Sequence, residues 1–353
     1  MRLSRRALLT LGGLAALSVT VPACRRMLWQ IVFPPDAPVV PPPGAAATPL
    51  TAGGRSLVAI VHGDDVPAMV RRALDLLGGL ERLDLAGRRV LVKPNVVSGA
   101  APPTTSDPRV VGAVAGLARR AGAGSLAVGD MSAVLTLPTR PNLTRTGIAR
   151  AAEAVGAAVL AFDEGEWVEV RPPANQLQKV VYVAKAVHEA ERLISVPVVK
   201  THRSAGFSCA LKNTVGCVHG RNKPWMHGDL DWEAAVAELN TAVRPHLYVV
   251  DGLRSMIAGG PWSGESAATE LILASGDPVA LDAVALALLK SFGRSEKIAE
   301  GGVWDNAQIR RAIALGLGAS GPERMTLAAE SLRRDASAFD RLVADVRRRV
   351  GLA

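Results

Sequence analysis

The sequence predicts an α/β fold with a largely parallel sheet flanked by helices. From residue 56 onward, short apolar or β-branched runs alternate with segments of ten or more residues that have helical periodicity. This alternation is typical of β–α–β units. Five of the apolar runs stop at a polar residue or a tight glycine turn, and no internal repeat of fixed period is present. A hydrophobic content of 49% is that of a globular protein.

The expected strands are short runs rich in Val, Ile, Leu and Ala. They cover residues 56–61, 89–92, 125–128, 158–162, 166–170, 180–183, 193–199, 246–250, 271–274 and 325–328, the last as an edge strand. Parallel strands have their carboxyl ends at one edge of a sheet. We therefore expect a ligand site among the residues that follow these runs.

Helices are expected where apolar residues recur at helical spacing, at residues 66–77, 107–121, 144–155, 278–291, 306–315 and 337–350. The second of these begins with the capping residue Asp107 and with Pro108 at the first helical position. Asp277, before Pro278, is interpreted as a helix cap only. A further helix is expected to begin at Gly206 or Phe207 and to reach Val215, and its free N–H groups would attract an anion.

The first 55 residues differ in character from the rest. Ser4-Arg5-Arg6 followed by an apolar run to Ala23 is a twin-arginine leader pattern, so residues 1–24 are predicted to be an export leader or an uncleaved anchor. Cys24 leaves a lipidated N-terminus as another alternative. Residues 25–55 are rich in Pro and Ala and are predicted to be a tether before a single α/β domain at 56–353. The expected location is periplasmic or otherwise extracytoplasmic, with the export machinery as a partner and membrane contact through the N-terminus only.

The formal net charge of +9 does not indicate nucleic-acid binding. Six Arg and one Asp in residues 1–55 account for more than half of the excess. Aromatic residues make up only 4% of the chain, so platforms for base stacking are scarce. No nucleic-acid partner is therefore expected.

The cysteine and histidine patterns predict no metal site. Three cysteines (Cys24, Cys209 and Cys217) are too few for a four-cysteine iron–sulfur cluster. Cys209 and Cys217 are interpreted as two buried thiols, with a disulfide as the alternative. The spacing of His202, His219 and His227 fits no standard zinc pattern.

A long interval without acidic residues follows the run at 193–199. No Asp or Glu occurs from residue 192 to 228, whereas the interval holds six basic residues, Arg192, Lys200, Arg203, Lys212, Arg221 and Lys223. A solvated basic loop would explain this composition. Its position directly after a buried strand favours a binding site instead.

Polar residues that end separate strands are expected to meet in one cleft. They are Lys93, Asn95, Asp130, Lys200, His202 and Asp251. The loop from His219 to His227 is expected to lie across the mouth of this cleft, and Trp262, after Gly260-Pro261, to be exposed or to cap it.

Lysine suits phosphate or carboxylate groups, and an aspartate can orient a histidine or hold a cation. The predicted catalytic residues are His202 as acid or base, and Asp130 and Asp251, either of which would orient it or hold a cation. The predicted residues that bind an anionic small molecule or cofactor are Lys93, Asn95, Lys200, Lys212, Asn213 and Arg221.

Eight short motifs, in order, resemble one family. They are KPN (93–95), TTSDP (104–108), VGD (128–130), PVVKTH (197–202), ALKNTVGCVHGR (210–221), VVDG (249–252), GGP (259–261) and ASGDPVALDAVA (274–285). Together they resemble the domain-of-unknown-function 362 family over residues 56–295, which leaves 296–353 as a C-terminal extension. The resemblance implies an exported protein. Some members carry an appended ferredoxin-like module, which this sequence lacks, and the resemblance supplies no reaction.

Two functions are consistent with these observations. One is an exported enzyme of unknown reaction acting on an anionic ligand, and the other is a non-catalytic cofactor-binding or redox-partner protein of the cell envelope. The sequence identifies neither the substrate nor a cofactor.

Overall fold

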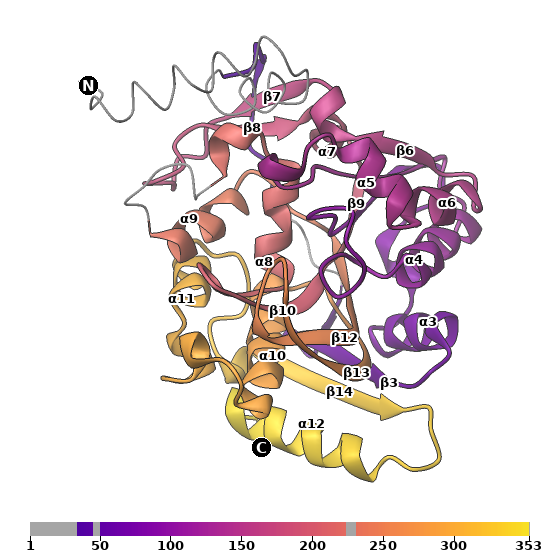
Figure 1. Ribbon diagram of the computed structural model, residues 1–353, viewed down its shortest axis with the longest axis vertical. Coiled ribbons are helices and arrows are strands. Elements are labelled where there is room, and N and C mark those ends of the chain that lie inside the picture. The colour runs from indigo at the N-terminus through magenta and orange to yellow at the C-terminus, as the bar shows by residue number, and fades with distance from the viewer. Residues whose placement is uncertain (1–33, 45–49, 224–230, 353) are drawn as a thin grey trace.

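The computed structural model describes residues 34–44, 50–223 and 231–352 of the chain. It has the predicted α/β fold, with an eleven-stranded sheet and a separate three-stranded sheet (Figure 1). The main path of the large sheet has the order β14-β3-β13-β12-β9-β4-β5-β6. β14 is an edge strand, as predicted.

The strands of this path correspond closely to the expected runs. They are β3 (Arg55–His62), β4 (Arg89–Pro94), β5 (Ser125–Asp130), β6 (Ala158–Ala161), β9 (Arg192–Val196), β12 (Leu247–Gly259), β13 (Gly264–Ser275) and β14 (Met325–Ser331). On this path only β13 runs antiparallel to both of its neighbours, because it returns from β12 as a hairpin. The other seven strands share one direction, so their carboxyl ends lie at the same edge.

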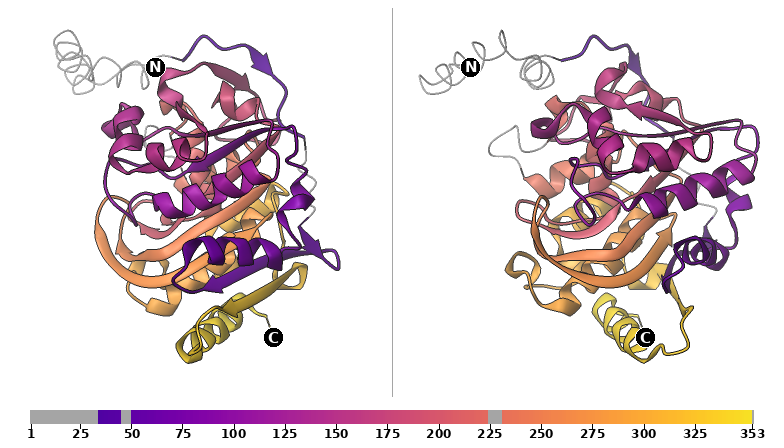
Figure 2. Two further views of the ribbon diagram at one scale, coloured as in Figure 1. Left: turned by 90° about the vertical axis from the view of Figure 1, so that its right-hand side faces the viewer. Right: turned by 45° about the vertical axis from the view of Figure 1, so that its right-hand side comes forward.

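Helices cover both faces of the sheet. α3 (Val66–Leu76), α4 (Pro108–Arg120) and α6 (Ile148–Glu153) lie on one side of Figure 1, away from α9 (Trp232–Leu239), α10 (Pro278–Phe292) and α11 (Ala307–Ala314). The alternation along β3 divides its side chains between two cores, with Ala59 and Val61 in one and Val58 and Ile60 in the other. The terminal helix α12 (Ser337–Val350) lies at one end of the molecule beside β14 (Figure 2).

The expected strand at 193–199 is divided at Pro197 into β9 and β10 (Val198–His202). β9 pairs with β4 and β12, whereas β10 pairs with β12 and with β11 (Gly206–Ser208). The prediction of a helix from Gly206 or Phe207 is therefore wrong. Gly206 adopts a φ of 70° and begins a return strand, and the helix α8 covers only Ala210–Asn213.

The N–H groups at the start of α8 are occupied by a carboxylate of the protein itself. Asp282, buried in the middle of α10, accepts hydrogen bonds from the N–H of Ala210 at 2.6 Å and of Leu211 at 3.3 Å. The Gln308 side-chain amide donates to the same carboxylate at 3.0 Å. The expected anion site at this helix start is thus filled by Asp282.

Two other expected elements differ in length. The helix at 144–155 is broken into α5 (Thr139–Arg145) and α6, because Gly147 between them adopts a left-handed φ of 79°. β12 and β13 are several residues longer than predicted. Their outer halves extend beyond the fully apolar part of the sheet and pair mainly with each other, so they do not need a continuous apolar run. Asp277 is confirmed as the N-cap of α10.

Part of the predicted tether packs on the domain. β1 (Val39–Val40) pairs with β7 (Trp167–Val170), which with β8 (Val181–Ala184) completes the small sheet. Leu50 is buried, and β2 (Thr51–Ala52) pairs with β3. The predicted leader, including Arg5, Arg6 and Cys24, lies outside the described residues. Among the described helices, none combines the length and the apolar character that crossing a membrane requires.

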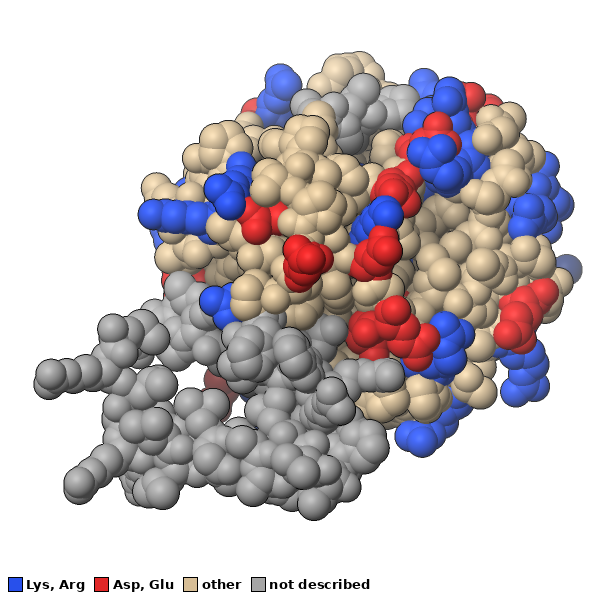
Figure 3. Space-filling view, turned by 90° about the horizontal axis from the view of Figure 1, so that it is seen from above, with Lys and Arg blue, Asp and Glu red and all other residues tan. Residues whose placement is uncertain are grey.

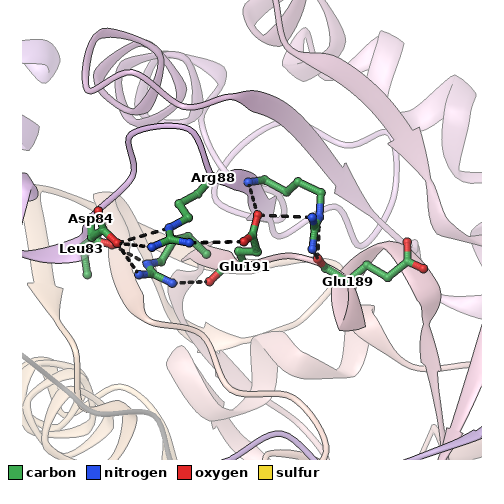
Figure 4. A network of polar contacts seen from close by, with 7 residues as sticks. Leu83, Asp84, Arg88, Glu189 and Glu191 are labelled. Carbon is green, nitrogen blue, oxygen red and sulfur yellow. Dashed lines mark hydrogen bonds and ion pairs between the residues drawn. The ribbon is translucent and has the colours of Figure 1, made fainter.

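Charges of both signs are interspersed on the face of the molecule that is seen from above (Figure 3). A separate network of arginine and acidic side chains lies at the amino-terminal ends of β4 and β9 (Figure 4). The Arg88 guanidinium lies 2.6 Å from Asp84 and 3.6 Å from Glu191, and Arg192 lies 3.3 Å from Asp84. Exposed ion pairs contribute little individually. This network therefore adds little to stability, and it lies at the edge opposite the strand ends.

Asp282 provides a test of how the fold positions α8. We expect Asp282→Ala to lower the free energy of unfolding by about 3 kcal/mol, because it leaves buried N–H groups without an acceptor. Asp282→Asn retains one acceptor oxygen and should cost less. The matched control is Asp75→Ala on the exposed face of α3, with an expected change below about 0.5 kcal/mol. Urea denaturation measures all three, and equal losses for Asp282→Ala and Asp75→Ala would contradict this role.

Candidate functional site

A cavity of about 400 Å³ opens at the carboxyl ends of β4, β5 and β10, a volume suited to a small molecule. Seven of the nine predicted site residues line it, and they come from these three strand ends and from α8. They are Lys93, Asn95, Asp130, Lys200, His202, Lys212 and Asn213. The structure therefore brings these seven residues together, while the cleft as a binding site and the roles of the residues remain predictions.

A buried ion pair forms the floor of the cavity. The Lys93 ammonium lies 2.6 Å from the Asp130 carboxylate, and both side chains are almost fully buried. Lys93 also donates to the Pro94 carbonyl at 2.6 Å and to the Asn213 side-chain oxygen at 3.1 Å. The other Asp130 oxygen accepts from the N–H of Val96 at 2.6 Å. Each charge is thus both paired and hydrogen-bonded, which a buried ion pair requires.

Gly216 allows the backbone to approach this ion pair. A Cβ atom at this position would lie 2.1 Å from the Asp130 carboxylate and 2.7 Å from the Lys93 ammonium. The Gly216 carbonyl also accepts from the N–H of Met131 at 3.2 Å, which ties the segment after α8 to the end of β5. Only glycine is compatible with this contact.

Asn213 and Asn95 connect the ion pair to its neighbours. The Asn213 side-chain amide donates to the Ser195 hydroxyl at 2.8 Å. The Asn95 side-chain amide donates to the Thr104 carbonyl at 2.9 Å. Both amide side chains therefore have internal partners, and they position the walls of the cavity.

Three further lysines face the same cavity. Lys200 donates to the Thr104 carbonyl at 2.7 Å, and Lys223 donates to the Val215 carbonyl. Lys212, which is partly buried, has no hydrogen bond or ion pair with any described residue. Burial lowers the pKa of Lys200 and of Lys223 to about 7, and that of Lys212 to about 8. The positive charges of Lys212 and Lys93 also lower the pKa of Lys200.

His202 is held in one tautomer by the turn that follows it. Its Nδ1 accepts hydrogen bonds from the N–H of Ser204 at 3.2 Å and of Ala205 at 3.1 Å. Burial, and then the charges of Lys212 and Lys200, lower its pKa to about 2. The ring is therefore neutral with the proton on Nε2. In this state His202 can donate a hydrogen bond into the cavity, but Nδ1 is not free to accept a proton.

The structure places Asp251 and Arg221 outside the cavity lining, which corrects their predicted positions. Asp251 is buried and accepts from the N–H of Asp107 at 2.7 Å and of Leu253 at 3.1 Å, and burial raises its pKa to about 7. It was misplaced because β12 does not end there but continues to Gly259. Arg221 is exposed beyond the cavity.

The loop expected across the mouth is only partly described. His219 is buried, its Nδ1 accepts from the N–H of Arg221, and its ring packs at 5.0 Å from that of Trp167. It does not line the cavity. His227 lies outside the described residues. Instead, Pro261 and Trp262 at the tip of the β12–β13 hairpin lie at the cavity, and Trp262 is 44% exposed.

Sequence reasoning did not assign Lys223, Arg203 or Trp232 to the site, although all three line the cavity. Arg203 and Lys223 both lie in the interval 192–228, whose lack of acidic residues could have indicated them. Trp232 follows that interval at the start of α9, and no motif marked it.

The two described cysteines are free and buried, in agreement with the interpretation as buried thiols. Burial raises the pKa of Cys217 to about 12 and that of Cys209 well above its usual value. Among the described residues, no group of three or more His, Cys, Asp or Glu side chains is arranged to hold a metal ion.

The fold and the site define an α/β protein with a cationic cavity at the strand ends. Residues 90–287 match the family described as domain of unknown function (DUF362), and the chain belongs to that family. This span includes every lysine of the cavity.

One relative is the thylakoid-associated protein sll1697 of Synechocystis sp. It is 30% identical over 230 residues, which cover 63% of this chain and 70% of that protein.

A structure of the lactate racemase apoprotein from Thermoanaerobacterium thermosaccharolyticum aligns with a TM-score of 0.35 and 16% identity. The alignment covers 54% of this chain and 50% of that one. This likeness is too distant to carry an argument about function.

The contact at Gly216 yields a second testable prediction. We expect Gly216→Ala to lower the free energy of unfolding by about 3 kcal/mol, because the added methyl group separates Lys93 from Asp130 and leaves both charges buried. Gly165→Ala is the matched control, since its Cβ would lie 3.7 Å from the nearest atom, the Phe162 carbonyl oxygen. Thermal and urea unfolding measure the effect. Equal stability of the two variants would show that the ion pair does not depend on Gly216.

Proposed function

We propose that this protein binds an anionic small molecule or cofactor in the cavity above the Lys93–Asp130 ion pair. The observation that carries the proposal is the imbalance of charge. Among the described residues, five basic side chains and one acidic side chain line the cavity. The acid is already neutralised by Lys93, so Lys200, Lys212 and Lys223 face a small volume without a counter-charge from the described lining residues.

Three charged lysines around one small cavity are unfavourable unless an anion binds between them. Burial disfavours the charged form of an ammonium group and lowers the pKa of all three lysines. Neighbouring lysines lower the pKa of Lys200 and of Lys223 further. A bound oxyanion offsets the repulsion and accepts charge-assisted hydrogen bonds. Lys212 is the first candidate for direct contact, because Lys200 and Lys223 already donate to backbone carbonyls.

His202 would act on the same ligand through Nε2. With Nδ1 occupied by two backbone N–H groups, the Nε2 proton is the one available for a hydrogen bond to the anion. In an enzyme, this group would stabilise negative charge that develops on the ligand. In a binding protein, it would only orient the ligand. We favour an enzyme, and a non-catalytic cofactor-binding or redox-partner protein is the alternative.

We further propose that the protein acts outside the cytoplasm after twin-arginine export. The support is Arg5-Arg6 before an apolar run, and the Pro-rich segment that follows. Changing both arginines to lysine should leave the precursor in the cytoplasm, as measured by cell fractionation. Normal amounts of the Arg5→Lys/Arg6→Lys protein in the envelope would disprove the export proposal.

Anion binding can be tested with sulfate, whose charge is constant over the working pH range. We expect sulfate affinity, measured by isothermal titration calorimetry, to fall at least about tenfold between pH 6 and pH 9. The reason is that lysines with a pKa near 7 to 8 lose their positive charge as the pH rises. An affinity that is unchanged, or that rises with pH, would contradict binding through these lysines.

The same measurement identifies the contact residue. Lys212→Gln removes the ammonium that has no partner among the described residues, and should weaken sulfate binding about tenfold at pH 6, the value for one charge-assisted hydrogen bond. Lys179→Gln, at an exposed position away from the cavity, is the control and should bind as the unaltered protein does. If both variants bind alike, Lys212 is not part of the site.

His202→Asn separates the enzyme from the binding protein. Asparagine places an acceptor near the position of Nδ1, so it retains the turn at Ser204 and Ala205 while removing the Nε2 proton. The ligand would first be identified by mass spectrometry of protein purified from an exporting host. We then expect the unaltered protein to convert this ligand, and His202→Asn to bind it but convert it at least about 100-fold more slowly. A ligand that the unaltered protein leaves unchanged would favour the non-catalytic alternative.

A further inference from the structure

The cavity has exposed apolar side chains in its lining as well as the buried ion pair. Five large apolar side chains are exposed among the described residues, namely Val39, Leu135, Leu177, Trp262 and Leu332. Two of them, Leu135 at 68% exposure and Trp262 at 44%, line this one cavity. Single exposed apolar residues are common on protein surfaces. Two exposed apolar side chains that line the same small cavity indicate that an apolar group of a ligand could cover both.

Other apolar side chains line the same cavity as Leu135 and Trp262. Val97 and Val134 line the cavity on the side of Leu135, and Pro261 and Trp232 line it as well. Ligand pockets usually combine an apolar wall with a few polar groups that fix orientation. Here Lys93 and Lys200 lie at strand ends and Lys212 lies on α8. Leu135 and Trp262 are the strongly exposed apolar members of the lining.

The backbone that carries Trp262 is fixed to the anion site. Thr104 donates from its hydroxyl to the Trp262 carbonyl at 3.3 Å, and the Thr104 carbonyl accepts from the Lys200 ammonium at 2.7 Å. The N–H of Arg203 also donates to the Gly260 carbonyl at 3.3 Å. These hydrogen bonds hold the backbone of Trp262, although the residue is partly exposed. Thr104 fixes the position of this backbone relative to Lys200.

We propose that the ligand is an amphipathic organic anion, with an oxyanion head among the lysines and a flat apolar group that covers Trp262 and Leu135 at the mouth. This inference rests on the proposed function and specifies its ligand class. Phosphate, sulfonate and carboxylate heads share the chemistry that the lysines recognise. The apolar group removes the two exposed side chains from water, which is the source of the additional affinity.

Methanesulfonate and benzenesulfonate test the inference, because they share head group and charge and differ in the apolar group. We expect benzenesulfonate to bind at least about tenfold more tightly in isothermal titration calorimetry at pH 6, the scale expected for burying an apolar group of this size. Trp262→Ala and Leu135→Ser should each reduce that preference several-fold, because they weaken benzenesulfonate binding more than methanesulfonate binding. Leu332→Ser, at an exposed apolar residue away from the cavity, is the control and should alter neither affinity.

The outcomes separate this inference from the proposed function. Equal affinity for the two sulfonates would overturn the inference and leave anion binding intact. A preference that survives both Trp262→Ala and Leu135→Ser would also overturn it, since the apolar group would then lie elsewhere. Absence of binding for sulfate and for both sulfonates would overturn the proposed function, and this inference with it.

Discussion

The buried contact between the Lys93 ammonium and the Asp130 carboxylate is the constraint on which the rest of the site depends. It joins the ends of two adjacent parallel strands, and it admits the segment after α8 only because residue 216 has no side chain. Removing either partner would leave an uncompensated buried charge, which costs several kcal/mol. The pair also uses the acidic side chain that the described lining contains, so the positive charge of the other lysines is left for a ligand.

The neighbouring groups follow from this arrangement. His202 is neutral because it is buried among cations and because its Nδ1 is committed to the backbone. Lys200 is fixed through the Thr104 carbonyl, and the Thr104 hydroxyl fixes the backbone of the hairpin tip. A displacement of Lys200 would therefore be transmitted through Thr104 to the backbone of Trp262. The lysines give the cavity its positive charge, and Pro261 and Trp262 of the hairpin give it part of its apolar surface.

The fold class and most elements could be predicted because apolar periodicity and capping residues are local signals. The cluster of Lys93, Asp130, Lys200 and His202 could be predicted for a related reason, since parallel strands carry residues to one edge. Asp251 could not be placed, because the continuation of β12 depends on pairing with β13, a long-range contact. The hairpin at Gly206 was mistaken for a helix because its local composition suits either, and only pairing with β10 decides between them.

Asp282 has a consequence for how the protein would respond to its surroundings. It occupies the N–H groups at the start of α8, and those groups do not change with pH. Recognition of an anion is thereby left to side chains that gain and lose protons near neutrality. The filled fraction of the cavity would follow the acidity of the medium at a constant ligand concentration. Ligand would be retained in mildly acidic surroundings and released in alkaline ones, as these lysines lose their charge.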